Sequence, residues 1–143
     1  MVNKIWFDMD GTIANLYAVE NWLPMLTAQD PTPYAQAEPM LNMSALARLL
    51  HKAQRLGYAV GIVSWLSKTA TAEYNMAVTE TKIEWLRKHL PSVQWNEVKI
   101  VAYGTPKHEI CEGILFDDEE RNRQAWGEGA YEPSEILEFL RGL

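Results

Sequence analysis

Four aspartates occur as two close pairs, and each pair directly follows a short apolar run. Asp8 and Asp10 follow the first run, and Asp117 and Asp118 follow a run near the C-terminus. A carboxylate can attack phosphorus to form a covalent intermediate, and a second carboxylate can move protons to the leaving group and from water. Crowded carboxylates also favour a hard divalent cation, and Mg²⁺ suits one or two carboxylates together with a substrate phosphate. The two pairs are therefore candidates for nucleophilic, proton-transfer and metal-binding roles.

A serine and a lysine supply the other groups that such chemistry requires. Ser64 follows another apolar run, and Lys107 lies a short interval before the run that ends at the second aspartate pair. A hydroxyl can bind a non-bridging phosphoryl oxygen and an ammonium group can neutralise its charge, and such positioning dominates phosphoryl transfer. Ser67 is the alternative to Ser64, and Lys68 competes with Lys107.

Two nearby polar residues carry weaker signals. Lys82 lies on a predicted helix beside Glu84 and Arg87, and we interpret it as a solvated charge rather than a site residue. Asn122 follows the second aspartate pair. It has two open interpretations: a hydrogen bond that supports the acidic loop, or an exposed position on a helix.

Apolar runs and amphipathic stripes define the elements that must position these residues. The predicted strands cover residues 4–7, 58–63, 98–102 and 113–116, with a short fifth at 129–131. The predicted helices cover residues 17–26, 43–56 and 79–90, and a last helix begins at Ser134 as N-cap. Gly57 is placed to end the second helix, and residues 27–39, which contain three prolines, are predicted to be a loop.

The alternation of apolar strands with helices predicts an α/β fold with a mostly parallel sheet and helices on both faces. In a doubly wound, Rossmann-like sheet of order 3-2-1-4-5, the first strand lies between the second and the fourth. Ligands bind at the carboxyl ends of such strands. Asp8, Ser64 and Asp117 would then meet in one crevice.

These motifs resemble those of the haloacid dehalogenase (HAD) superfamily of hydrolases. The segment Phe7-Asp8-Met9-Asp10-Gly11-Thr12 resembles the first HAD motif, DxDGT. Ser64 resembles the second motif and Lys107 the third, and Leu115-Phe116-Asp117-Asp118 resembles the acidic fourth motif. The four motifs occur in the HAD order over nearly the whole chain, and the resemblance implies a three-layer HAD core.

The resemblance also implies roles for the aspartates. Asp8 would be the nucleophile that forms an aspartyl-phosphate, and Asp10 would be the general acid and base. Asp8, the Asp10 backbone carbonyl and Asp117 would bind Mg²⁺, and Asp118 would bind it directly or through water. The implied activity is a magnesium-dependent phosphatase.

The residues expected to border the substrate follow from the same motifs. Ser64 and Lys107 would contact the phosphoryl group, while Gly11 and Thr12 form the turn out of the first strand. Trp65 follows Ser64 directly. Its indole would either stack on a base or sugar or serve only in packing.

Residues from about 13 to 42 form an insert in the position where HAD enzymes carry a cap. We expect one domain over residues 1–143, with this insert as a minimal cap over an open site that a neighbouring subunit could complete. The segments at 81–86 and 114–118 resemble the deoxyribonucleotidase-type branch, whose cap is larger. The candidate substrate is therefore a small phosphorylated molecule such as a (deoxy)nucleoside monophosphate.

Composition narrows the alternatives. The net charge of −6 disfavours a nucleic-acid partner, the single cysteine excludes an intrachain disulfide, and no 18-residue apolar run or signal-peptide pattern occurs. We expect a soluble cytoplasmic protein. The competing hypotheses are a phosphatase of terminal phosphates on nucleic acid or protein, a non-catalytic phosphate-binding or nucleotide-binding module on the same fold, and an interaction protein without a site.

Overall fold

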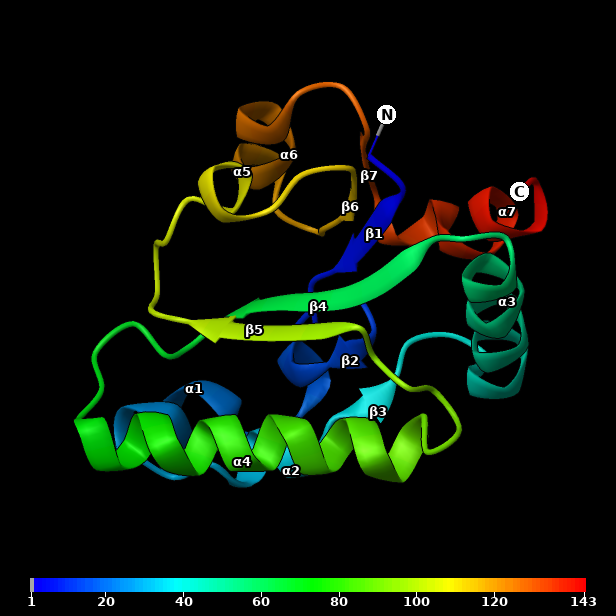
Figure 1. Ribbon diagram of the computed structural model, residues 1–143. Helices are drawn as coiled ribbons and strands as arrows, with labels where there is room; N and C mark the ends of the chain where they lie inside the picture. The colour runs from blue at the N-terminus through cyan, green and yellow to red at the C-terminus, as the bar shows by residue number, and fades with distance from the viewer. Residues whose placement is uncertain (1) are drawn as a thin grey trace.

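A five-stranded parallel sheet organises residues 2–143, which the computed structural model describes (Figure 1). Its strands are β1 (Lys4–Phe7), β4 (Ala59–Trp65), β5 (Glu97–Val101), β6 (Ile114–Phe116) and β7 (Ala130–Tyr131). They lie in the order β5-β4-β1-β6-β7, and every neighbouring pair is parallel. Counted along this sheet the order is 3-2-1-4-5, so the predicted topology and the α/β fold class are confirmed.

The central strand is apolar on both faces because helices cover both sides of the sheet. Ile5 and Phe7 pack into a large core with α3 (Met43–Arg55), α4 (Ala72–His89) and α7 (Ile136–Arg141). Trp6, which points the other way, packs with Cys111 and Leu115 beside α5 (Lys107–Ile110) and α6 (Glu120–Trp126). Alternating residues of one strand therefore serve two cores, as expected of a buried parallel strand.

The helix boundaries follow local capping signals. The Asn42 side chain accepts a hydrogen bond from Ala45 N and begins α3, and Gly57, at φ +97°, follows its end. The prediction for α4 was too short: the helix begins at Ala72 rather than at residue 79, because the Thr71 hydroxyl caps Tyr74 N.

The predicted N-cap of the last helix was wrong. The 3₁₀ turn η2 (Pro133–Glu135) leads into α7. Glu132 is the N-cap of η2 and Glu135 is the N-cap of α7, so Ser134 caps neither. Glu132 and Glu135 form a reciprocal capping box, in which each side chain accepts from the other's backbone. Ser134 is therefore the second residue of the 3₁₀ turn rather than a cap.

The insert between β1 and α3 is more structured than predicted. It contains η1 (Leu16–Ala18), α1 (Trp22–Thr27), α2 (Thr32–Gln36) and a two-stranded antiparallel sheet of β2 (Ala14–Asn15) and β3 (Glu38–Pro39). The single helix predicted over 17–26 is thus a 3₁₀ turn followed by α1, and the predicted loop contains α2.

The insert is held against α4, which runs in front of α1 and α2 in Figure 1. Tyr34 of α2 packs against Tyr74 and Val78 of α4, and the Tyr74 hydroxyl donates to Asp30 O across 3.0 Å. The insert is thereby fixed to the core. No helix within residues 2–143 has the length and hydropathy that a membrane crossing requires.

Candidate active site

Asp8 and Asp117, which follow β1 and β6, both contact the buried Lys107. Lys107 Nζ donates to Asp8 Oδ1 across 2.9 Å and to Asp117 Oδ2 across 2.7 Å. Lys107 is only 3% exposed, and Asp8 and Asp117 are also buried. Because desolvated charges interact strongly, this arrangement fixes the Asp8 carboxylate in position and direction.

The charges in this cluster shift the pKa values of its members. Burial alone would lower the pKa of Lys107, but the negative charges of Asp8 and Asp117 outweigh it and raise the pKa above its usual range. Burial, together with the charge of Asp8, raises the pKa of Asp117. Lys107 therefore stays protonated. The carboxylates on either side of it repel each other when both are ionised.

A threonine hydroxyl connects Asp8 to the fourth aspartate. Thr12 Oγ1 lies 3.2 Å from Asp8 Oδ2 and 3.3 Å from Asp118 Oδ1, and it accepts a hydrogen bond from Asp118 N at 3.2 Å. Thr12 is buried and does not line the cavity in front of the carboxylates. Its hydroxyl therefore orients Asp8 and Asp118 from the side that faces away from the cavity.

Gly11 provides the room for Asp118. Its φ of +80° is a conformation that favours glycine, and a Cβ at this position would overlap the Asp118 carboxylate and lie 2.9 Å from the Tyr17 ring. Gly11 also does not line the cavity. Like Thr12, it shapes the carboxylate cluster.

Asp8, Asp117 and Asp118 fit a divalent cation. Each offers a carboxylate oxygen, and these oxygens lie within 4.8 Å of one another. Burial and the charges of Asp8 and Asp117 raise the pKa of Asp118 to about 8. A cation would relieve this repulsion, and a set of hard oxygen donors is what Mg²⁺ prefers.

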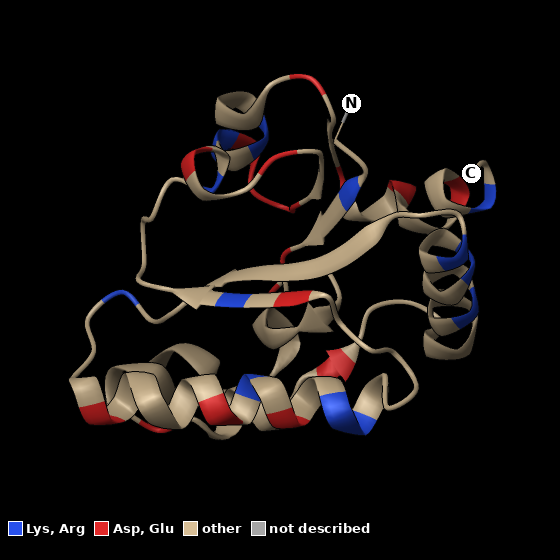
Figure 2. Cartoon of the chain, in the orientation of Figure 1, with Lys and Arg blue, Asp and Glu red and all other residues tan. Residues whose placement is uncertain are grey.

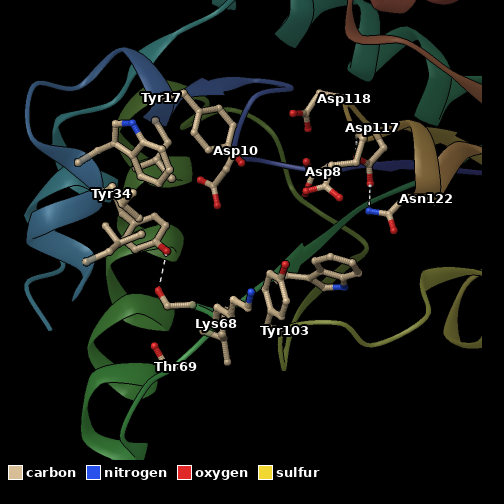
Figure 3. A pocket seen from close by; sticks show the side chains of 18 of the residues that line it. Asp8, Asp10, Tyr17, Tyr34, Lys68, Thr69, Tyr103, Asp117, Asp118 and Asn122 are labelled. Atoms are coloured by element: carbon tan, nitrogen blue, oxygen red, sulfur yellow. Dashed lines mark hydrogen bonds between the residues drawn. The ribbon is translucent and has the colours of Figure 1, made fainter. Parts of the chain in front are cut away.

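The loop after β6 and the first turn of α6 hold Asp117 through both carboxylate oxygens. Glu119 N donates to Oδ1 at 2.9 Å, and Asn122 Nδ2 donates to Oδ2 at 3.1 Å (Figure 3). Arg123 of α6 donates to the Asp117 carbonyl at 2.9 Å. Of the two interpretations left open for Asn122, the structure supports the hydrogen bond to the acidic loop.

Asp10 pairs with a lysine that the sequence interpretation assigned to solvent. Lys82 is 1% exposed, and its Nζ donates to Asp10 Oδ2 across 2.9 Å. The interpretation of Lys82 as a solvated charge was wrong. A signal was present: Lys82 comes four residues after Val78 and three before Trp85, both of which are buried, so it lies on the inner face of α4.

Ser64 lies at the end of β4 behind the cavity. It is fully buried, and its Oγ accepts a hydrogen bond from Lys82 Nζ at 2.7 Å. Its hydroxyl proton remains available to a further acceptor. Ser67, the alternative, lines the cavity and is hydrogen-bonded to the Tyr34 hydroxyl at 2.7 Å.

A cavity of about 300 Å³ opens in front of the aspartates. Figure 3 shows the Asp8, Asp117 and Asp118 carboxylates on one side, with Tyr17 and Tyr34 on another. The remaining walls are largely apolar and come from the insert and from the segments after β4 and β5. These residues include Leu16, Trp22, Leu23, Leu26, Trp65, Leu66 and Tyr103.

Trp65 forms part of the cavity wall, and both its indole nitrogen and its ring have contacts that hold it in place. Its indole nitrogen donates to Thr105 O at 2.8 Å, and its ring packs on Tyr103 with centroids 5.1 Å apart. The Arg121 guanidinium lies 4.8 Å from the Trp65 ring centre, within range of a cation–π contact. Trp65 thus lines the cavity.

The doubly wound sheet, with an acidic cluster at the carboxyl ends of β1 and β6, gives the chain a Rossmann-like HAD fold. One solved structure with a similar fold is a D,D-heptose 1,7-bisphosphate phosphatase from Burkholderia thailandensis. The alignment covers 98% of this chain and 97% of that one, with a TM-score of 0.59 and 12% sequence identity. No protein-family model matches the chain, and no curated protein does either. The predicted fold is therefore confirmed, and a known phosphatase shares it.

Proposed function

We propose that the protein is a magnesium-dependent phosphomonoester hydrolase that acts through an aspartyl-phosphate on Asp8. The observation that carries this proposal is the ion pair between Asp8 and the buried Lys107, next to the three-carboxylate cluster at the cavity wall. A fixed nucleophilic carboxylate, a permanent cation and a place for a metal are the components that phosphoryl transfer uses. The fold shared with a known phosphatase agrees with this proposal.

The first step forms the covalent intermediate. An Asp8 carboxylate oxygen attacks phosphorus, the bond from phosphorus to the ester oxygen breaks, and Asp10 gives a proton to the departing alkoxide. Lys107 holds the Asp8 carboxylate in place and offsets negative charge that accumulates beside it.

The second step releases phosphate. Asp10, now ionised, takes a proton from a water molecule that attacks the same phosphorus atom, and the bond between phosphorus and Asp8 breaks. Inorganic phosphate leaves, Asp8 is again a carboxylate, and Asp10 is again protonated. Mg²⁺ bound by Asp8, Asp117 and the Asp10 carbonyl, with Asp118 direct or through water, would supply Lewis-acid neutralisation of the phosphoryl charge.

The substrate class that we propose is a small phosphomonoester with an aromatic group, such as a (deoxy)nucleoside monophosphate. Tyr17 and Trp22 meet edge to face with ring centroids 5.0 Å apart, and both line the cavity. An aromatic wall can stack on a base, whereas a polyol gains less from it. The short insert supplies this wall and thus serves as the cap.

A polymeric substrate has less support than a small one. Lys and Arg residues occur on several elements, and on α4 they are interspersed with acidic residues (Figure 2). The helix α3 carries Arg48, Lys52 and Arg55, and none of the three lines the cavity. Binding to a nucleic-acid end depends on phosphate contacts from basic groups and weakens with salt. The distribution of charge favours a small phosphate ester over a nucleic acid.

Hydrolysis of p-nitrophenyl phosphate by the wild type and by Asp8→Asn, each with Mg²⁺ and with EDTA, tests the proposal. We expect turnover only for the wild type with Mg²⁺, and Asp8→Asn should remain folded by circular dichroism. An inactive wild type that still binds inorganic phosphate would identify a binding module. An Asp8→Asn variant as active as the wild type would exclude Asp8 as the nucleophile.

A further inference from the structure

Lys82 is a buried lysine whose three ammonium protons each have an acceptor. Nζ donates to Asp10 Oδ2 at 2.9 Å, to Ser64 Oγ at 2.7 Å and to the Trp65 carbonyl at 2.7 Å. The Tyr34 ring lies 4.9 Å from Nζ and closes one side. An ammonium group has three donors, so this site satisfies all of them.

Packing alone does not explain a lysine at this position. The other inward residues of α4 near it, Val78, Trp85 and Leu86, are apolar and buried. A buried ion pair costs much of its attraction in desolvation, and an apolar residue of similar volume often stabilises a protein as well or better. The reason for the lysine is therefore to be found in the groups that it binds.

Those groups lie at the carboxyl ends of two neighbouring strands, β1 and β4. Asp10 follows β1, and Ser64 and Trp65 end β4, so one ammonium group ties both strand ends to α4. Asp10 lines the cavity, and its side chain is 17% exposed. Because Lys82 engages Oδ2, Oδ1 remains the oxygen of this carboxylate that can exchange protons with a substrate.

We infer that Lys82 is a positioning residue for Asp10: its ammonium group holds Oδ2 of the carboxyl group and thereby sets the angle from which Oδ1, when it carries the proton, protonates the leaving group. This inference rests on the proposed function. Lys82 is not in contact with the cavity and acts only through Asp10, while Lys107 acts on Asp8. Each of the two proposed catalytic aspartates therefore has its own buried lysine: Lys107 for the nucleophile Asp8 and Lys82 for the acid Asp10.

The dependence on the leaving group tests this role. p-Nitrophenolate departs without a proton, whereas an alkoxide requires one, so only alkyl esters need a well-placed acid. The variants are Lys82→Met, Asp10→Asn and the double variant, with Lys88→Met as a matched control because Lys88 is exposed on the same helix. The measurement is kcat/KM, which reports the first chemical step, on p-nitrophenyl phosphate and on glycerol 2-phosphate.

We expect Lys82→Met to lower kcat/KM about 10²-fold on glycerol 2-phosphate, within the range of general acid catalysis, and much less on p-nitrophenyl phosphate. Lys88→Met should match the wild type on both esters. The double variant should be no slower than Asp10→Asn, because both changes remove the same proton transfer. An equal loss on the two esters, or multiplied losses in the double variant, would overturn the inference.

The role of Lys82 can be tested even if Lys82→Met does not fold. If Lys82→Met fails to fold, Lys82→Gln keeps hydrogen-bond donors, and the double variant removes the carboxylate that would otherwise be buried without its partner. The outcomes also separate the two proposals. Activity that survives Asp8→Asn contradicts the phosphatase mechanism, whereas an Asp8-dependent enzyme with equal losses on both esters contradicts only the role of Lys82.

Discussion

Lys107 Nζ lies 2.9 Å from Asp8 Oδ1, although the two residues are 99 positions apart in the chain. The contact forms because β1 and β6 are neighbours and α5 begins at Lys107, so the folded sheet delivers a cation to the proposed nucleophile. The same ammonium group holds Asp117 on β6's side at 2.7 Å. One buried lysine thus joins the two strand ends that carry the chemistry.

Lys107→Met should therefore damage both activity and stability. Removing a preorganised charge that faces the transition state is expected to lower kcat/KM about 10²–10³-fold. Breaking a buried ion pair is expected to lower the free energy of unfolding by about 3–5 kcal/mol without metal. Steady-state kinetics and urea unfolding with EDTA measure the two effects, with Lys88→Met as control. An unchanged kcat/KM would show that Lys107 does not act on the phosphoryl group.

Gly11→Ala should weaken metal binding more than it weakens the fold. The alanine Cβ would overlap the Asp118 carboxylate, and its φ of +80° would add about 1–2 kcal/mol of backbone strain. Gly57→Ala is the matched control, because Gly57 has a φ of +97° with no atom within 4 Å of the added carbon. We expect both variants to lose stability in urea, and only Gly11→Ala to lose Mg²⁺ affinity by calorimetry. Equal Mg²⁺ affinities would mean that Asp118 has no part in the metal site.

Stability without metal should fall as the pH rises. Burial and neighbouring charges raise the pKa of Asp118 to about 8, well above the value near 3.8 of an unfolded aspartate. Between these values the unfolded chain has already lost this proton and the folded chain keeps it, so rising pH favours unfolding. Between about pH 4 and pH 8, Tm in EDTA should therefore decline, and the decline should be smaller in Asp118→Asn.

Mg²⁺ should reverse this trend, because a cation favours the ionised carboxylates. The rise in Tm on adding Mg²⁺ should be larger at pH 8 than at pH 6. A Tm in EDTA that increases over this range, or an identical slope in Asp118→Asn, would contradict the assignment of Asp118 to the cluster.

Trp22→Ala should affect nucleotides selectively. Stacking of a base on an aromatic side chain contributes about 1–3 kcal/mol, so KM for a deoxynucleoside monophosphate should rise about 5–150-fold. The kcat/KM for glycerol 2-phosphate should change little, since that substrate has no ring to stack. A uniform loss on both substrates would show that Trp22 only supports the insert.

The sequence alone was sufficient to predict the sheet and the residues at its strand ends. Each strand is a short apolar run, because both of its faces are covered, and such runs are bounded by residues that stop them. The order of the strands then required Asp8 and Asp117 to converge, and the structure places both on Lys107.

Features that depend on tertiary contacts were not predictable in the same way. The first turns of α4 bury Tyr74 and Val78 against the insert, so their apolar character has meaning only once the insert has folded. Lys82 was misinterpreted because its charge suggested solvent, although its spacing from Val78 and Trp85 indicated the inner face of the helix. Its partner Asp10 lies 72 positions away, which local patterns do not reveal.

Direct detection of a phosphoryl group on Asp8 tests the central claim most directly. In Asp10→Asn the first step with p-nitrophenyl phosphate needs no acid, whereas the second step lacks its base, so the intermediate should accumulate. Acid quench followed by peptide mass spectrometry should find one phosphoryl group on Asp8, removable by hydroxylamine and missing from the Asp8→Asn, Asp10→Asn double variant. A phosphoryl group on another residue, or turnover by the wild type with none trapped on Asp8, would contradict the account.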